Sequence, residues 1–555
     1  MRRLLLVVCL LDALPASWQE PAGAVGPVVA LKHGRVRGEF VHVRGTEKRV
    51  KQYLAIPFAR PPVGPFAWLR AEPEPWEGER EGRRQPPMCI PDPDIIATVS
   101  RLMSLQVSPV EVSEDCLYLT VSVQAAASAG AKIKVMVWIH GGGLAMGAAS
   151  QFDGAPLAAY QNIITVVIQY RLGILGFLST GDEHARGNWG LLDQLAALRW
   201  VQDNIGAFGG DPQAVTVAGE SAGAISASIL PVFWHQIVAN LTGCQQSSTE
   251  EMIRCVKGKK REDLIRVAKQ MRIFLGAVVD GDFLTDTAEE LLRRKEVLKV
   301  PVLMGITNHE FGWILPQSFA PPGWDKGMNR ESTLAVVNMF NPSGTALANS
   351  LIIDQYLRDA RTPEEIRDRF THLVGDILMM LPVLSVAGYL SGPGMWRAVS
   401  IRSGAGVDRP WQQLGRGSGP GSAEPPQPTQ VSSVAGLFQM PAFQFTCMSL
   451  RTAPTCTDTA GPASSWRTTE MTWHSCSAAV SGMVTRNWWA QVCDCVLSSP
   501  TGPSLPHWPQ YDRERQEYLE LGLTQTPRQK LKEDALHFLT AVLPQRLRER
   551  AAGAM

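Results

Sequence analysis

Apolar residues recur in short unbroken runs along most of the chain, and amphipathic stretches separate these runs. The runs at 134–139 (KVMVWI) and 162–170 (NIITVVIQY) are rich in β-branched residues, a composition typical of strands that are covered on both faces. The stretch at 188–205 has the spacing of a helix with one apolar face. That face is expected to carry Leu191, Leu195, Leu198 and Val201. Strands alternating with helices predict an α/β fold with a mainly parallel central sheet flanked by helices.

The alternating pattern extends over residues 25–390. From 391 to 500 the chain is rich in Gly and Pro and then in Trp, Cys, Thr and Ser, with no sustained period. This segment is therefore expected to be aberrant, either disordered or displaced in reading frame. Ordinary globular sequence resumes at 501–555, ends in a helical tail, and is expected to complete the same domain.

The first 24 residues predict a secretory signal peptide. Arg2 and Arg3 precede an apolar run from Leu4 to Leu11, and small residues follow near Ala24. The run is too short for a membrane span, and no later stretch is expected to be long and apolar enough to cross a bilayer. The protein is expected to be secreted or to reside in the endoplasmic reticulum lumen, and the C-terminal AAGAM, which is not an HxEL-type retention signal, favours secretion.

The charge balance argues against one class of partner. The chain has 53 Lys and Arg against 52 Asp and Glu, a net charge of +1. Such a chain has no strong field that would attract nucleic acid. We therefore expect no nucleic-acid partner.

The strongest chemical signal is GESAG at residues 219–223. An apolar strand at 214–218 leads into it and a small-residue helix follows, which is the strand-to-helix setting that a G-x-S-x-G nucleophile requires. Both glycines are needed because a side chain at either would clash where the backbone turns sharply. Ser221 is therefore the candidate nucleophile.

A glycine-rich turn, HGGG at 140–143, directly follows the apolar run that ends at residue 139. Such a turn can aim backbone N–H groups at the oxygen that becomes negative in an acyl-transfer intermediate. With these motifs the chain resembles the type-B carboxylesterases of the α/β-hydrolase fold, a group that includes the cholinesterases. The resemblance also rests on SEDCLYL, YRLGILGF, GNWGLLDQ, FGGDP and HEFGW, and it covers about Val28 to Leu390 and Leu505 to the end.

The resemblance implies an enzyme that hydrolyses small-molecule carboxylic esters through an acyl-enzyme on Ser221, with no cofactor and no metal. It implies an oxyanion hole formed by the amides of Gly142, Gly143 and Ala222. It also implies a triad acid at Glu310, which would orient the imidazole of the base and stabilise its charged form.

The resemblance further implies two disulfides, Cys89–Cys116 and Cys244–Cys255. Five later cysteines, all beyond residue 446, have no partner in this scheme. Asn240 begins the sequon Asn-Leu-Thr, and a secretory route makes its glycosylation expected.

The chain departs from the family pattern in two places. Between Ser221 and Cys244 it is much shorter than the family, so the strand after the nucleophile helix is expected to be missing and its neighbours to lose ladder hydrogen bonds. The Asp-His-Gly-Asp/Glu motif of the family is also absent. His474 lies where that motif should be, but in Thr-Trp-His-Ser-Cys, which matches nothing. His309 is expected to be a neighbour of Glu310 and not the base.

The genetic code offers an account of the missing motif. Back-translation of residues 466–479, moved by two bases, permits Glu-Asp-His-Gly-Asp-Asp-Val-Ala-Phe-Val-Phe-Gly-Gly, which is the histidine motif of the family. An unrelated stretch would have to permit the right residue at every step. We therefore interpret His474 as an accident of the reading frame.

Three interpretations of function remain open. The first is a serine carboxylesterase whose activity is impaired because the histidine motif is absent. The second is a non-catalytic, secreted, cholinesterase-like interaction protein, which the intact GESAG and HGGG motifs disfavour. The third is a defective splice or gene-model product. The sequence predicts neither the acyl and alcohol specificity nor the oligomeric state.

Overall fold

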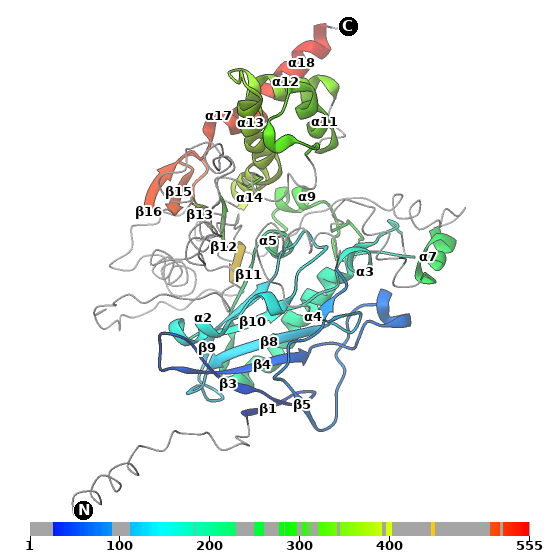
Figure 1. The fold of residues 1–555 in the computed structure, drawn as a ribbon, viewed down its shortest axis with the longest axis vertical. Helices are drawn as coiled ribbons and strands as arrows, with labels where there is room; N and C mark the ends of the chain where they lie inside the picture. The colour runs from blue at the N-terminus through cyan, green and yellow to red at the C-terminus, as the bar shows by residue number, and fades with distance from the viewer. Residues whose placement is uncertain are drawn as a thin grey trace, which may run out of the picture.

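A computed structural model places an 11-stranded mixed sheet at the centre of the chain, with helices against it (Figure 1). The residues that the structure describes are 26–91, 111–182, 184–228, 249–259, 263, 277–281, 283–296, 302–307, 310–311, 320–340, 345–390, 396–401, 446–449, 511–521 and 525–553. In space the strands run β16-β15-β13-β12-β14-β11-β9-β10-β8-β4-β3. Their bounds are β3 (Glu39–His42), β4 (Arg49–Pro57), β8 (Tyr118–Gln124), β9 (Ile133–Ile139), β10 (Ile164–Ile168), β11 (Gly210–Gly219), β12 (Val302–Thr307), β13 (Trp396–Ile401), β14 (Thr446–Ser449), β15 (Glu517–Leu521) and β16 (Gln525–Gln529).

The centre of the sheet is parallel on both sides of β14. Strands β10, β9 and β11 are parallel to one another, as are β12, β13 and β15. Both edges are antiparallel, because β3, β4, β8 and β10 pair in that way on one side and β15 with β16 on the other. The strands predicted at 134–139, 162–170 and 214–218 are confirmed as β9, β10 and β11, and all five residues of β10 are buried.

Strand β14 lies between β11 and β12 and is antiparallel to both. The sequence predicts a missing strand at this point, with a loss of ladder hydrogen bonds for its neighbours. The structure shows that this expectation is wrong for part of the ladder. Thr216–Gly219 of β11 have a pairing partner, because they pair with residues 446–449. The replacement comes from the segment 391–500, which also contributes β13 beside β12.

Helix α4 (Trp189–Asn204) confirms the helix predicted at 188–205, but its buried face differs from the predicted one. Leu191 and Val201 are buried, whereas Leu195 and Leu198 are only half-buried. Asp193 lies on the buried face. Its charge can be buried there because its carboxylate accepts hydrogen bonds from the Arg171 guanidinium. A pattern built on apolar residues alone could not place a buried ion pair on that face.

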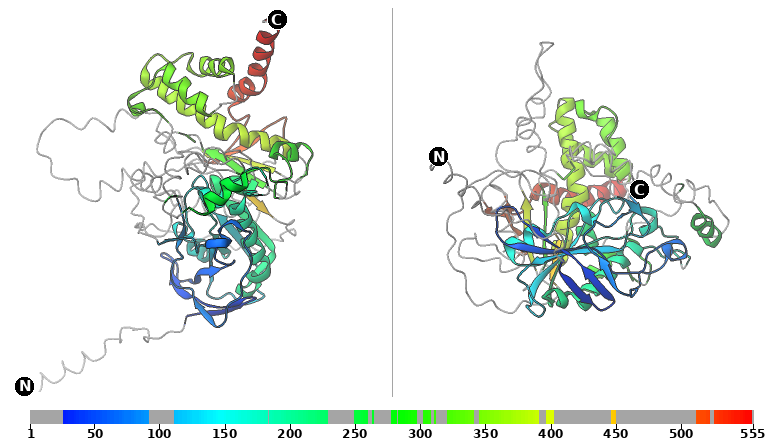
Figure 2. Two further views of the ribbon diagram at one scale, coloured as in Figure 1. Left: turned by 90° about the vertical axis from the view of Figure 1, so that its right-hand side faces the viewer. Right: turned by 60° about the horizontal axis from the view of Figure 1, so that its bottom comes forward.

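The other described helices lie against the sheet or beyond it (Figure 1). In chain order they are α2 (Ala155–Gln161), α3 (Gly173–Phe177), α5 (Ala222–Ser228), α7 (Thr249–Lys257), α9 (Ala288–Arg293), α11 (Arg330–Phe340), α12 (Ala346–Leu357), α13 (Pro363–Gly375), α14 (Leu381–Leu390), α17 (Glu533–His537) and α18 (Leu543–Gly553). Figure 2 shows α11 to α13 gathered with the C-terminal helices beyond the sheet. Their shared core includes Leu351, Leu373, Phe538 and Leu543.

The continuous helical stretch Pro363–Leu390 is long and apolar enough to cross a membrane by length and composition. The expectation that no later stretch would meet this test is therefore wrong. However, 44% of its most apolar window is buried in the protein. Because a core helix of a soluble protein passes the same test, this stretch is weak evidence for a span.

Candidate active site

Three loops that carry the predicted site residues leave the sheet at the same edge. Strand β9 ends directly before His140, and β11 ends two residues before Ser221. Strand β12 ends three residues before Glu310. Strands β9 and β11 are parallel, and β12 runs in the direction of β11 because both are antiparallel to β14. The carboxyl ends of α/β sheet strands are the usual place for a site, since their loops meet there.

Ser221 occupies a sharp turn between β11 and α5. Its φ of 51° lies in the left-handed region, which a residue with a side chain rarely adopts. A Cβ at Gly219 would lie 2.5 Å from the carbonyl carbon of Gly223, and a Cβ at Gly223 would overlap the carbonyl oxygen of Ile139. The steric need for both glycines, inferred from the sequence, is therefore present in the structure.

The glycine turn after β9 lies against Ser221. A Cβ at Gly141 would be 3.0 Å from the Cβ of Ser221. Gly142 and Gly143 have φ values of 110° and 63°, which lets the backbone fold tightly here. Among the described residues, none accepts a hydrogen bond from the amides of Gly142, Gly143 or Ala222. Amide donors beside Ser221 that no described residue uses are what an oxyanion hole would require.

Glu310 is almost completely buried, with 6% of its surface exposed. The backbone N–H of Thr307 donates to its Oε1. Burial raises the pKa of Glu310 to about 7, while the hydrogen bond from Thr307 and the positive charge of Lys532 oppose that rise. The carboxyl group is held in one orientation at the end of β12, as an orienting acid would need to be.

Comparison with known proteins identifies the family of the chain. The model of the carboxylesterase family matches residues 25–235 and 230–395, which is more than half of the chain. The chain belongs to the carboxylesterase family. It is 40% identical over 401 residues to pyrethroid hydrolase Ces2e of Rattus norvegicus, with 66% of this chain and 70% of that protein covered.

Two longer matches extend over nearly the whole carboxylesterase chain. Liver carboxylesterase 1 of Mus musculus is 32% identical over 579 residues, with 95% of each chain covered. The medium-chain fatty acyl-CoA hydrolase precursor of Anas platyrhynchos is 33% identical over 584 residues, with 97% of this chain and 96% of that protein covered. By family the chain is a serine carboxylesterase with the α/β-hydrolase fold, and the family's reaction is the hydrolysis of carboxylic esters.

Two groups of this carboxylesterase site were not assigned a role from the sequence. Burial and the nearby charge of Glu310 raise the pKa of Glu220 to about 8. Lys532 donates to Asp376. The neighbouring Gly375 lies close to Glu310, since a Cβ built at Gly375 would be 3.4 Å from the Cβ of Glu310. Glu220 is visible in GESAG as the residue before the nucleophile. Lys532 has no such signal, because only folding brings the C-terminal segment to Glu310.

His140 is fully buried, and we do not assign it the role of the base. Its ring stacks on Tyr170 with centroids 4.5 Å apart, and its Nδ1 lies 2.9 Å from the carbonyl oxygen of Gly141. Burial lowers its pKa to about 4, so the ring is neutral near pH 7. His309 and His474 lie outside the described residues.

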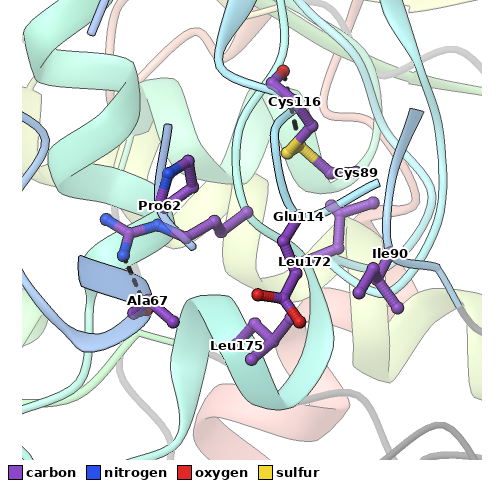
Figure 3. A pocket seen from close by; sticks show the side chains of 9 residues that line it. Pro62, Ala67, Cys89, Ile90, Glu114, Cys116, Leu172 and Leu175 are labelled. Carbon is purple, nitrogen blue, oxygen red and sulfur yellow. Dashed lines mark hydrogen bonds between the residues drawn. A yellow bond between two sulfur atoms is a disulfide. The ribbon is translucent and has the colours of Figure 1, made fainter. Parts of the chain in front are cut away.

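The disulfide Cys89–Cys116 is present, and Cys255 is disulfide-bonded. Cys244, the expected partner of Cys255, lies outside the described residues, as does Asn240. Figure 3 shows a small pocket whose lining includes Cys89 and Cys116. Neither Ser221 nor Glu310 lines this pocket, so it is separate from the candidate site.

Proposed function

We propose that this chain carries the active site of a serine carboxylesterase for small-molecule esters, in a form whose activity is impaired. Ser221 attacks the ester carbonyl, the amides of Gly142, Gly143 and Ala222 stabilise the oxyanion, and water hydrolyses the acyl-enzyme. The observation that carries the proposal is the strained φ of 51° at Ser221, beside the glycine turn. A purely adhesive relative would have no use for that strain.

Impairment follows from the displaced histidine motif. Glu310 is the proposed acid that would orient an imidazole, and we propose that this imidazole is encoded in the shifted frame of residues 466–479. The end of the family match at residue 395 supports this view, since the match stops just inside the segment 391–500. The two matching stretches overlap at 230–235, which lies between Ser221 and Cys244, where we infer from the sequence that the chain is shorter than the family.

A secretory route is the proposed setting. The N-terminal 24 residues have the form of a signal peptide, and disulfides form and persist in oxidising compartments. The Cys89–Cys116 bond supports that compartment. We propose secretion or residence in the endoplasmic reticulum lumen, with glycosylation at Asn240 and a second disulfide between Cys244 and Cys255.

The chain as printed is expected to hydrolyse 4-nitrophenyl acetate far more slowly than an intact carboxylesterase. Without a positioned imidazole the Ser221 hydroxyl stays protonated, and loss of a triad member typically costs on the order of 10⁴ to 10⁶ in rate. Steady-state turnover of the purified chain and of Ser221→Ala measures this. A turnover within roughly tenfold of an intact relative, abolished by Ser221→Ala, would contradict the proposed impairment and would point to a histidine outside the described residues, His474 or His235, as the base.

A further inference from the structure

We propose that Glu220 acts as the general base for Ser221 in this chain, an inference that rests on the proposed function. The proposal concerns the slow reaction that remains when the imidazole of the family is displaced. It assigns a catalytic task to a residue of the GESAG motif other than the nucleophile.

The carboxylate of Glu220 and the side chain of Ser221 border the same point above the glycine turn. A side chain at Gly141 would overlap Glu220 Oε2 and would also lie 3.0 Å from Ser221 Cβ. Adjacent side chains of a regular strand point to opposite faces, but the φ of 51° at Ser221 breaks that alternation. No hydrogen bond joins the two side chains, so the hydroxyl proton would reach the carboxylate through one water.

The two carboxyls at this edge differ in their hydrogen bonds within the described part of the chain. No described residue forms a hydrogen bond or an ion pair with the Glu220 carboxylate. Glu310, by contrast, is held by the Thr307 backbone N–H. Among the described residues, protonation of Glu310 would therefore disturb a structural hydrogen bond and protonation of Glu220 would not.

The groups around Glu220 suit it to work in weakly alkaline solution. Burial and the charge of Glu310 raise the pKa of Glu220 to about 8, so it becomes a carboxylate as the pH rises through that value. Tyr170 keeps its proton, because burial and the charge of Glu220 raise its pKa. His140 is neutral, since burial lowers its pKa to about 4. The only cation that acts on Glu310 here is Lys532, among the described residues.

The proposed step conserves atoms and charge. The Ser221 hydroxyl gives its proton to the Glu220 carboxylate as its oxygen bonds to the ester carbonyl carbon, and the carbonyl electron pair moves onto the oxygen beside the amides of Gly142 and Gly143. When the carbonyl re-forms, the bond to the alcohol breaks and the leaving oxygen takes the proton from Glu220. Water then follows the same route: it gives a proton to Glu220, attacks the acyl carbon, and Ser221 leaves with that proton.

The test compares four variants of the full chain with the unsubstituted protein: Glu220→Gln, Glu220→Asp, Ser221→Ala and the control Glu331→Gln. Glu331 is exposed in the first turn of α11. Each protein is assayed with 4-nitrophenyl acetate from about pH 6 to about pH 9, with mass spectrometry for acetylated Ser221 and circular dichroism for the fold. Rates of Ser221→Ala are subtracted as background.

The Ser221-dependent rate is expected to rise with pH through about 8, where Glu220 ionises. Glu220→Gln should lower that rate by about 10²-fold and remove the rise, because general-base catalysis typically contributes at least that factor. Glu220→Asp should retain part of the rate, since a shorter carboxylate can still act through water. Glu331→Gln should leave both the rate and the pH profile unchanged.

Three outcomes would overturn the role of Glu220. The first is an unchanged rate in folded Glu220→Gln. The second is a rate that rises near pH 6.5, as a histidine of ordinary pKa would give, and is lost in His474→Asn or His235→Asn. The third is the absence of acetylated Ser221 at every pH, which would exclude Glu220 as a working base while leaving the proposed impairment standing.

Discussion

Restoring the family's histidine motif is expected to raise esterase activity on the order of 10⁴- to 10⁶-fold. The variant has Glu-Asp-His-Gly-Asp-Asp-Val-Ala-Phe-Val-Phe-Gly-Gly in place of residues 467–479, which is the shifted translation of that stretch. The restored imidazole would take the proton of Ser221 and be oriented by Glu310, whose carboxyl is already fixed by Thr307. Turnover of 4-nitrophenyl acetate by the two chains measures the gain.

A matched control carries the same replacement with asparagine in place of its histidine. This control keeps the other twelve residues of the replacement and removes only the base, so its activity should fall back to that of the original chain. If the histidine and asparagine versions are equally slow and equally folded, the displaced motif is not what limits this chain.

Asp193→Ala is expected to destabilise the fold by about 3–5 kcal/mol, because removing one partner of a buried ion pair leaves the other charge uncompensated. Asp193 is 0% exposed and Arg171 is 3% exposed. The carboxylate accepts hydrogen bonds of 2.8 Å from Arg171 Nε and 2.6 Å from Arg171 Nη2. The pair joins α4 to the connection between β10 and α3, in which Arg171 lies. Guanidinium denaturation followed by tryptophan fluorescence reports the midpoint.

The control for this variant is Asp203→Ala on the same helix. Asp203 lies 2.8 Å from Lys32 in a pair whose side chains are 46% and 58% exposed. An exposed pair typically contributes about 0–1 kcal/mol, so the midpoint should scarcely move. Equal midpoints for the two alanine variants would show that the buried pair does not hold α4.

The parts of the site that could be predicted from sequence are those fixed by local sterics. Gly219 and Gly223 are required by contacts within a few residues of Ser221 and at the end of β9. The unbroken apolar runs of β9, β10 and β11 likewise carry their own strand signal. Such features need no knowledge of distant residues.

The parts that could not be predicted depend on long-range placement. The four residues of β14, Thr-Cys-Met-Ser, have no period that would mark them as the strand between β11 and β12. The raised pKa of Glu220 depends first on its burial in the folded chain and then on the charge of Glu310, which lies far along the sequence. The position of Lys532 beside Asp376 likewise depends on the packing of the C-terminal helices against α13. Tertiary structure alone brings these residues together.

The nucleotide sequence of codons 466–479 tests the central claim, that this carboxylesterase has its histidine motif displaced in frame. The displaced frame requires particular bases at codon positions that the amino-acid sequence does not determine. These are AGG for Arg467, a final C for Thr468, a final G for Thr469, CAT for His474 and TGT for Cys476. Each is one choice among synonymous codons, so an unrelated stretch would rarely satisfy all of them. We predict that the coding sequence satisfies all five. A Thr468 codon ending in any base but C could not yield histidine in the shifted frame and would contradict the account.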